Sequence, residues 1–563
     1  MIKTSTSVFN RFFDLLTPDR SEIRNIYVFA IFSGILSLGM PLGIQMIINF
    51  IQLGQISTSW FILVALVVSA IGFTGILNVF QLRITENLQQ RIFTRAAFEF
   101  AERIPKIKMV ELVKRYAPEL TNRFFDTLTI QKGLSKLLID FTAASLQIIF
   151  GLILLSFYHS FFLFTGLFLV VLLILIIRVT VKKGYFSSME ESTFKYKIAH
   201  WLEEIAHARI SFKMSGRSKM YLNRTNDYLN NYLTAREKHF KVLVQQYGFL
   251  IAFKVAIALT LLTVGGLLVI NEQINIGQFV AAEIVILLVL TSVEKLILSI
   301  EVVYDVLTAV EKIGQVMDLE LEEYSGAQLV RAEKGMQLKL DGLMFRTDAY
   351  LGTILDGIEL RVKPNEKIGI VSDTSLSTNA LFCIVSGLYE KTGGNLELDG
   401  IPIENLNKSE LRNQIGTLLK QDQLVYASLF DNIAMGDKTI DLNRVVQIFA
   451  ELGLSDFVAA CPENYKTIIN PEAHFIPKDI HTKLLIARAA IGQPRLVLLE
   501  DPTSGMSQQQ VELLQRHLAI FQNATILIET HHVGLLEKMD RVIEFKEGKI
   551  VYDGNYKGSN QTV

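Results

Sequence analysis

Residues 367–379 have the order of elements expected of a phosphate-binding loop. An apolar strand is predicted at Ile368–Val371, followed by a short polar turn and an apolar helix that begins near Asn379. In a P-loop of this form, glycines let backbone N–H groups surround a phosphate, and a lysine reaches the terminal phosphates. In this chain the positions of the three glycines, the lysine and the magnesium-binding hydroxyl are filled by Ser372, Ser375, Ser377, Thr378 and Asn379. The segment therefore keeps the form of a nucleotide site but replaces the residues that would bind the nucleotide.

These replacements all weaken phosphate binding. A non-glycine residue forced into the left-handed region costs about 1–2 kcal/mol. Loss of the lysine at Thr378 removes a charge-assisted contact worth about 1.5–3 kcal/mol, and Asp373 adds a negative charge nearby. ATP and Mg²⁺ are accordingly expected to bind weakly or not at all. The other interpretation is a polar turn that caps the next helix, because Ser, Thr and Asn are good N-caps.

Length and composition place this segment in a membrane protein of at least two domains. The chain has 563 residues, half of them hydrophobic, and its mean hydropathy is +0.34, so a single core is not expected. The formal net charge of −1 gives no reason to expect a nucleic-acid partner. Cys383 and Cys461 both lie in the C-terminal part, and no disulfide framework is implied.

Two long uncharged runs, 25–82 and 141–177, each have room for two membrane spans of about 20 residues. Residues 1–24 are predicted to be an amphipathic leader that precedes a retained membrane anchor, and residues 25–315 a six-helix membrane domain. The predicted spans are 26–51, 60–80, 138–157, 160–178, 246–270 and 278–300. The loops at 81–137 and 179–245 are long and charged, and the second is rich in Lys and Arg. Basic loops remain in the cytoplasm, so both loops and both termini are expected there.

Lys254 and Glu283 are ionisable residues within the last two predicted spans, where such groups suggest a function. The alternative for Lys254 is an ammonium that reaches the membrane surface. Because the two residues differ in predicted depth, no pair between them is expected.

The composition changes after a helical linker at 316–335. From Met336 to residue 555, short β-like runs alternate with amphipathic helices, a pattern typical of an α/β domain. Residues 556–563 are predicted to be a tail. The strand runs are Gln337–Leu340, Ile358–Val362, Ile368–Val371, Leu396–Leu398, Leu496–Leu499, Ile526–Ile528, Val542–Phe545 and Lys549–Tyr552.

Six spans followed by a P-loop-type α/β domain resemble an ABC exporter half-transporter, and the resemblance covers nearly the whole chain. Pro41-Leu42-x-x-Gln45-x-x-Ile48-Asn49 is similar to a first-span pattern of type I secretion exporters. Leu496 to Ser504 resembles Walker B, and Thr530-His531 resembles the switch histidine. The expected fold is therefore a six-span helical membrane domain with a C-terminal nucleotide-binding domain.

The resemblance assigns remnant catalytic roles to Asp501 and His531, and a possible Mg²⁺ contact to Glu500. Walker B usually has Asp followed by Glu, so the two carboxylates are exchanged here. The adenine-stacking aromatic is replaced by Thr347, with Tyr350 near enough to substitute. The Q-loop glutamine falls on Lys420, the D-loop aspartate on Ser507, and the five signature residues on Ile476–Ile480.

In the family, each ATP lies between Walker A of one subunit and the signature of the other. This chain lacks both halves, because Pro477 offers no N–H and Lys478-Asp479 replace two glycines. The alternative for Pro477–Asp479 is an ordinary helix start. Both composite sites would be damaged in a homodimer or a heterodimer, so efficient hydrolysis is not expected.

The resemblance implies a subunit of the inner (plasma) membrane that takes part in export of an unknown substrate with little or no ATPase. Its expected partner is a second ABC half-transporter, the same or different, with an adaptor and an outer-membrane channel as further partners. The alternative is a pseudo-ATPase scaffold that assembles a secretion complex without translocation. The third hypothesis is an ATP-driven exporter that reaches the same chemistry with unusual residues.

Overall fold

A computed structural model describes residues 7–52, 58–113, 115, 117–216, 218–347, 352–471, 476–504 and 506–556. The chain divides into two compact units. Unit 1 is Met1–Ile107 with Arg115–Glu320, and unit 2 is Lys108–Lys114 with Leu321–Val563. Each unit is described by itself below.

Unit 1 is helical, as predicted. In the part of the chain described, six helical runs are long and apolar enough to cross a membrane. They are Val8–Ile51, Thr58–Lys106, Pro118–Ser156, Ser160–His207, Met220–Ile270 and Ile276–Met317. The expected six-span membrane domain is confirmed, and several helices extend well beyond the apolar stretch that a bilayer needs.

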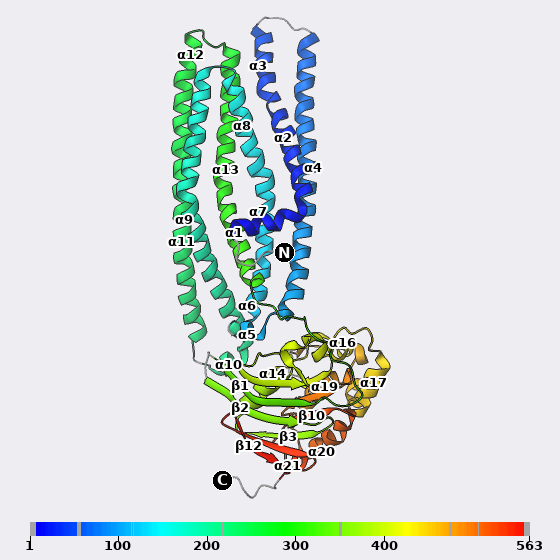
Figure 1. The fold of residues 1–563 in the computed structure, drawn as a ribbon. Helices are drawn as coiled ribbons and strands as arrows, with labels where there is room; N and C mark the ends of the chain where they lie inside the picture. The colour runs from blue at the N-terminus through cyan, green and yellow to red at the C-terminus, as the bar shows by residue number, and fades with distance from the viewer. Residues whose placement is uncertain are drawn as a thin grey trace. The chain divides into compact units, whose positions relative to one another are not determined.

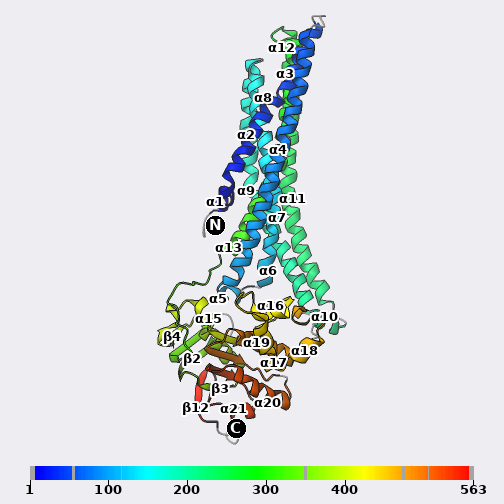
Figure 2. The same ribbon diagram turned by 90° about the vertical axis from the view of Figure 1, so that its right-hand side faces the viewer.

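The longest α-helices of this unit are α4, α9, α11 and α13, and α9 runs beside α11 while α2 runs beside α4 (Figures 1 and 2). The α-helices of this unit are α1 (Val8–Leu16), α2 (Arg20–Ser37), α3 (Gly39–Gln52), α4 (Thr58–Arg103), α6 (Ala117–Asn122), α7 (Asp126–Lys136), α8 (Thr142–Ser156), α9 (Ser160–His207), α10 (Arg209–Met214), α11 (Met220–Thr260), α12 (Gly266–Ile270) and α13 (Ile276–Met317).

The first span is broken between α2 and α3. α2 ends at Ser37, and α3 begins at Gly39. Pro41 has no N–H to donate to the carbonyl of Ser37, four residues earlier, so the hydrogen-bond ladder is interrupted at this point. The sequence feature that breaks the span is therefore a single proline.

Helix α13 packs closely on its neighbours in unit 1. A β-carbon at Gly184 of α9 would lie 2.2 Å from the Tyr304 ring of α13, and one at Gly133 of α7 would lie 2.2 Å from Val306. Tyr304 is fully buried, and its hydroxyl accepts a hydrogen bond from Gln246 of α11 at 2.6 Å. Glycines thus let α9 and α7 approach α13, and Gln246 of α11 is hydrogen-bonded to the hydroxyl of the buried Tyr304.

Unit 2 is an α/β domain with two main sheets. A six-stranded sheet has the order β12-β11-β3-β10-β9-β6, in which all pairs except β11–β12 are parallel, and a four-stranded antiparallel sheet has the order β2-β1-β4-β5. The strands are β1 (Leu338–Thr347), β2 (Gly352–Val362), β3 (Lys367–Ser372), β4 (Gly393–Leu398), β5 (Ile401–Pro402), β6 (Ile415–Leu418), β7 (Ala427–Ser428), β8 (Ile468–Ile469), β9 (Leu496–Glu500), β10 (Thr525–Glu529), β11 (Arg541–Lys546) and β12 (Lys549–Gly554).

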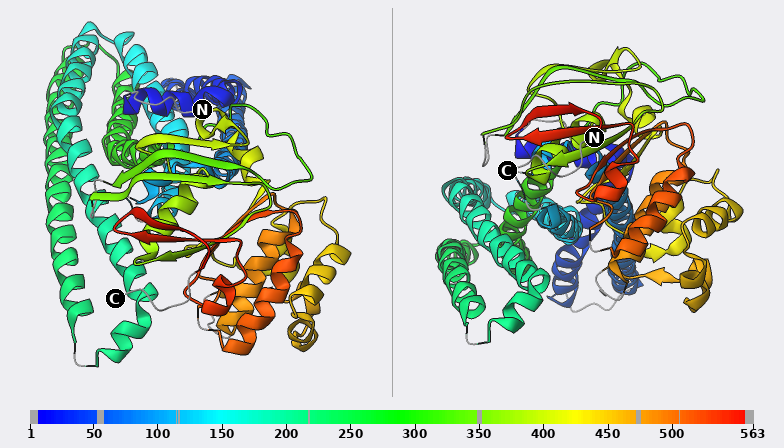
Figure 3. Two further views of the ribbon diagram at one scale, coloured as in Figure 1. Left: turned by 60° about the horizontal axis from the view of Figure 1, so that its bottom comes forward. Right: turned by 90° about the horizontal axis from the view of Figure 1, so that it is seen from below.

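Helices cover the parallel sheet, and Figure 3 shows those of the C-terminal half in orange beside the strands. The α-helices of the unit are α5 (Met109–Val113), α14 (Ser375–Val385), α15 (Lys408–Arg412), α16 (Leu429–Ala434), α17 (Leu442–Glu451), α18 (Ser455–Ala460), α19 (Lys478–Ile491), α20 (Gln508–His517) and α21 (Val533–Leu536).

Alternate residues of β9 belong to two different cores. Leu496 and Leu498 pack with α14 and the antiparallel sheet, whereas Val497 and Leu499 pack with α19 and α17. A strand buried on both faces is expected to be apolar throughout, which is why Leu496–Leu499 carries no polar residue. Burial on both faces fixes the strand and with it the position of Glu500 at its end.

Candidate functional site

The carboxyl ends of three neighbouring parallel strands meet at one edge of the sheet in unit 2. β3 ends at Ser372, β9 at Glu500 and β10 at Glu529, and Glu500 pairs in register with Glu529. Ligands of open α/β sheets bind at this edge. A cavity of about 450 Å³ lies there, and we call it the strand-end pocket. It is lined by Ser372, Asp373, Ser375, Leu418, Leu419, Lys420, Asp422, Lys478, His481, Thr482, Leu485, Glu500, Asp501, Ser504, Glu529 and His531.

The P-loop-like segment has a different shape from the one its spacing suggests. α14 begins at Ser375, four residues before the predicted start near Asn379. None of residues 372–379 has a positive φ, so the left-handed strain expected of the serines does not arise. The segment has become the first turn of a helix, which serine accepts without a steric cost, and the glycine-type loop is replaced by helical backbone.

The turn before α14 satisfies its own polar groups. The Ser372 hydroxyl donates to the carbonyl of Thr374 at 2.6 Å. The Asp373 carboxylate accepts from the backbone N–H groups of Thr374 at 2.8 Å and Glu547 at 3.0 Å. Thr374 is the N-cap of α14, but its side chain forms no capping hydrogen bond. The interpretation of this segment as a cap is therefore correct for the place where the helix begins and wrong for the side-chain hydrogen bond that a cap would form. The Asp373 carboxylate therefore accepts backbone hydrogen bonds in the turn where a P-loop would bind phosphate.

The other predicted binding residues lie within the body of the domain. Ser377 and Thr378 are buried, with Thr378 fully covered, and neither lines the pocket. The Ser377 hydroxyl donates to the carbonyl of Ile354 at 3.4 Å. Of the predicted phosphate-binding residues, only Ser372 and Ser375 face the pocket.

Asn379 is hydrogen-bonded to Glu500, the predicted Mg²⁺ contact, and to Gln421. Its amide nitrogen donates to Glu500 Oε2 at 2.7 Å and to Gln421 Oε1 at 3.1 Å. Its amide oxygen accepts from Gln421 Nε2 at 3.2 Å, and the Lys420 backbone N–H donates to the same Glu500 oxygen at 2.8 Å. Gln421 is one step from Lys420, the expected Q-loop position, and contacts both ends of the Asn379 amide. These groups form a closed cluster in which the Asn379 amide nitrogen lies between the two acceptor oxygens.

Glu529 adds an unforeseen carboxyl group to the pocket. Its side chain is 3 % exposed, beside the Thr378 hydroxyl, Glu500 and Asp501. Burial, and then the charges of Glu500 and Asp501, raise the pKa of Glu529 to about 7. Glu500 Oε1 and Glu529 Oε2 have no hydrogen-bond partner in the described part of the chain. The strand-end pocket thus holds buried carboxyl oxygens that no described group hydrogen-bonds.

Asp501 and His531, the predicted catalytic remnants, both reach the pocket wall and both are exposed. Asp501 has φ +42, and its carboxylate accepts from the Thr503 hydroxyl at 3.3 Å. Asp is among the residues that tolerate this conformation. The neighbouring histidine, His532, contacts Gln508 at 2.8 Å.

Two lysines line the pocket, each from a segment predicted to occupy a family motif, Lys420 from the Q-loop position and Lys478 from the signature position. Lys420 donates to the Ser375 hydroxyl at 3.2 Å, and Lys478 donates to Ser504 at 2.9 Å. Pro477 is the N-cap of α19, and Asp479 in the first turn accepts from Gln510 at 2.9 Å. The signature position is thus a helix start, and its charged residues contact the segment after β9.

Of the two residues predicted for the adenine site, the structure describes one. Thr347 is the last residue of β1. Tyr350 falls outside the described residues, so its role as an adenine-stacking aromatic remains a prediction.

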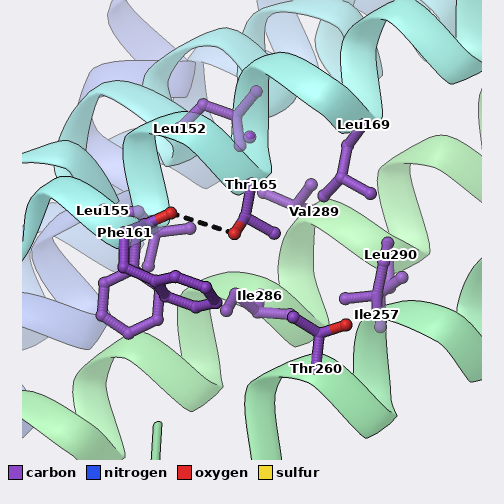
Figure 4. A pocket seen from close by; sticks show the side chains of 12 residues that line it. Leu152, Leu155, Phe161, Thr165, Leu169, Ile257, Thr260, Ile286, Val289 and Leu290 are labelled. Atoms are coloured by element: carbon purple, nitrogen blue, oxygen red, sulfur yellow. Dashed lines mark hydrogen bonds between the residues drawn. The ribbon is translucent and has the colours of Figure 1, made fainter. Parts of the chain in front are cut away.

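Within unit 1, Lys254 of α11 forms an ion pair with Glu294 of α13. Both side chains are about one-third exposed in the single chain. Glu283 is not the partner of Lys254, in agreement with their different depths. A separate apolar cavity of about 20 Å³ lies between α8, α9, α11 and α13 (Figure 4). Among the cavity residues labelled in Figure 4, the polar side chains are those of Thr165 and Thr260, and the Thr165 hydroxyl donates to the Phe161 carbonyl.

Comparison with known proteins identifies both units. The family description "ABC transporter transmembrane region" matches residues 23–293, and "ABC transporter" matches residues 355–504. The second domain type is one that in general binds ATP and Mg²⁺.

Curated relatives are the alpha-hemolysin translocation ATP-binding protein HlyB of Proteus vulgaris and the leukotoxin translocation ATP-binding protein LktB of Mannheimia haemolytica. Identity to HlyB is 26% over 303 residues, which are 54% of this chain and 43% of the relative. Identity to LktB is 26% over 296 residues, or 52% of this chain and 42% of the relative. The match therefore spans less than half the length of these relatives.

A solved structure of a bacterial Atm1-family ABC exporter with ATP bound superposes with a TM-score of 0.79. The alignment covers 95% of both chains at 16% identity, and this likeness establishes the fold. With six membrane-type helices, a strand-end pocket in an α/β domain and family matches in both units, the chain belongs to the ABC transporter family.

Proposed function

We propose that this chain is a membrane subunit of an ABC exporter that takes part in export while hydrolysing little or no ATP itself. The observation that carries the proposal is the closed cluster of Asn379, Gln421 and Glu500. The groups that would organise Mg²⁺ are bonded to one another, and the P-loop cation is absent at Thr378. Without these groups, the charge of a transferring phosphoryl group is not neutralised.

The charged side chains of the strand-end pocket also support little or no ATP hydrolysis. Asp373, Asp422, Glu500, Asp501 and Glu529 line the strand-end pocket, against the two lysines Lys420 and Lys478. A triphosphate entering this pocket would meet buried carboxylates and no glycine-type loop. Each lost charge-assisted contact weakens binding by about 1.5–3 kcal/mol, so a combined loss of several contacts lowers affinity by orders of magnitude.

The membrane unit supports participation in export. Its six spans and long helices have the exporter form, and the curated relatives are translocation proteins by name. We propose an inner-membrane location with unit 2 in the cytoplasm, and assembly as a homodimer or with a second ABC half-transporter. An adaptor and an outer-membrane channel are further partners under this proposal.

A second candidate function is a non-translocating scaffold. It is favoured by the contacts of Lys478 with Ser504 and of Asp479 with Gln510, because the segment that would complete a partner's ATP site is bonded within this chain. Such a chain would bind envelope proteins without moving a substrate.

The deciding experiment has two parts. The full-length chain in lipid nanodiscs is expected to show no ATPase above a lipid blank. In the native organism, deletion of the chain is expected to remove at least one protein from the medium or periplasm, as measured by quantitative mass spectrometry and restored by the wild-type copy. ATP turnover at the rate of an active half-transporter would overturn the ATPase part. If the set of exported proteins is unchanged and the chain pulls down a stable envelope complex, the scaffold function would be favoured over export.

A further inference from the structure

We propose that the side-chain amide of Asn379, bonded to Glu500 beside the strand-end pocket, takes the place of a divalent cation at Glu500 and excludes Mg²⁺ from this position. The inference rests on the proposed lack of ATPase and names the residue responsible for it. It concerns metal binding, which can be measured independently of transport.

The geometry of the amide carries the argument. The nitrogen of Asn379 lies 2.7 Å from Glu500 Oε2 and 3.1 Å from Gln421 Oε1. Both are oxygen atoms of the kind that hard cations bind, and both converge on a single donor. The amide oxygen is also engaged, by Gln421 Nε2 at 3.2 Å. Both ends of the Asn379 side chain are therefore fixed in the position from which a metal would contact these ligands.

Burial makes this arrangement hard to displace. Asn379 is 9 % exposed and Glu500 is 6 % exposed. Asn379 lies on α14, whose residues 380–385 are all buried in the core of the unit, whereas its partner Gln421 is exposed. Mg²⁺ demands near-octahedral geometry and gives up its water reluctantly. To enter, it would have to break the bonds of Asn379 to two partners and leave the amide buried without them.

Within the described ranges, there is no group of three or more His, Cys, Asp or Glu side chains placed to hold a metal ion. The family position of Asn379 carries a Ser or Thr, whose shorter side chain would leave the space between Glu500 and Gln421 open. A single residue type thus separates a bridged pocket from an open one.

The test converts the amide donor into an acceptor. Asn379→Asp places a second carboxylate against Glu500, so the repulsion is expected to be relieved by a cation. We expect the full-length wild type in nanodiscs to show no saturable Mn²⁺ binding in the micromolar range by electron paramagnetic resonance. We expect N379D to bind Mn²⁺ at least ten-fold more tightly and to gain several degrees in Tm on Mn²⁺ addition.

Matched variants make the result interpretable. Asn413→Asp adds the same charge at an exposed position of the same unit and is expected to behave as the wild type. N379D/E500Q is expected to lose the gain. Should N379D fail to fold, Asn379→Ser opens the space with less perturbation and should also gain Mn²⁺ binding.

Saturable Mn²⁺ binding by the wild type that E500Q abolishes would overturn the proposal. So would a folded N379D or N379S with no more Mn²⁺ binding than N413D. Loss of export in a transport assay would leave these metal measurements unaffected, so failure of the proposed function and failure of this inference remain distinguishable.

Discussion

The amide of Asn379 and the carboxylate of Glu500 form a buried hydrogen bond of 2.7 Å between α14 and the end of β9. The bond joins the residue predicted from the sequence to stand at the P-loop hydroxyl position to the residue predicted to stand at the Walker B aspartate position. In this chain the hydrogen bond between the two side chains contributes to the stability of the domain. Their contribution can be measured as a coupling between mutations.

Asn379→Ala is expected to lower the stability of unit 2 because Glu500 would retain only the Lys420 backbone N–H as a donor. A hydrogen bond to a charged group contributes about 1.5–3 kcal/mol, or several degrees of Tm for a domain of this size. Glu500→Ala and the double variant complete a thermodynamic cycle, measured by calorimetry of the full chain in nanodiscs. Strictly additive losses would mean that the two side chains do not interact.

Glu529→Gln is expected to remove a pH-dependent loss of stability. The folded pKa of about 7 lies above the ordinary 4.5, so the native state binds more protons than the unfolded state between these values. Stability therefore falls as pH rises from about 4.5 to about 7 and stays lower above that range. The fall amounts to a few kcal/mol, since each pKa unit is worth about 1.4 kcal/mol.

The measurement for Glu529 is Tm against pH from 5 to 8.5. E529Q should give a flatter profile than the wild type and a higher Tm at pH 8. Glu359→Gln removes the same charge from an exposed position on β2 and should leave the profile unchanged. A wild-type profile without a fall across this range would contradict the expectation.

Much of the fold was predictable because its signals are local. Uncharged runs predicted the six spans, and apolar runs such as Leu496–Leu499 and Ile526–Ile528 predicted β9 and β10, since strands buried on both faces need continuous apolar sequence. β6 (Ile415–Leu418) was missed because a four-residue strand with Gly416 and Thr417 has no such run. The start of α14 was placed too late because Ser and Thr favour both caps and turns.

The candidate site was predictable only in part. The P-loop-like spacing and the resemblances to Walker B and to the switch histidine found pocket-lining residues, namely Ser372, Ser375, Glu500, Asp501 and His531. Glu529 could have been noticed as a lone carboxylate that ends an apolar strand, but its neighbours depend on strand order. The bonds of Asn379 and the partner of Lys254 depend on how separate elements pack, which no local pattern encodes.

Gly184→Ala is expected to destabilise unit 1. The added methyl group would lie 2.2 Å from the Tyr304 ring, which is fully buried and held by Gln246. Overpacking of this kind costs about 1–3 kcal/mol. The matched control is Gly248→Ala on α11, where a β-carbon meets no atom within 4 Å. The control should be neutral or stabilising, because Ala is a better helix former than Gly by about 1 kcal/mol. Equal Tm values for the two variants in nanodiscs would show that the helices around Tyr304 separate easily.

Lys254 and Glu294 are expected to depend on each other's charge. The pair joins α11 to α13 within the membrane-spanning runs, where an unpaired charge is costly, by about 2.5–3.5 kcal/mol on insertion scales. Lys254→Glu and Glu294→Lys each place like charges together and should lower the amount of folded protein in the membrane. The double variant restores an opposite pair and should recover most of that amount, measured by fluorescence-detected size exclusion and Tm in nanodiscs. Because each side chain is about one-third exposed, the recovery tests the pair itself and not merely burial of either group. A double variant as poor as the single ones would mean that each residue acts through other contacts.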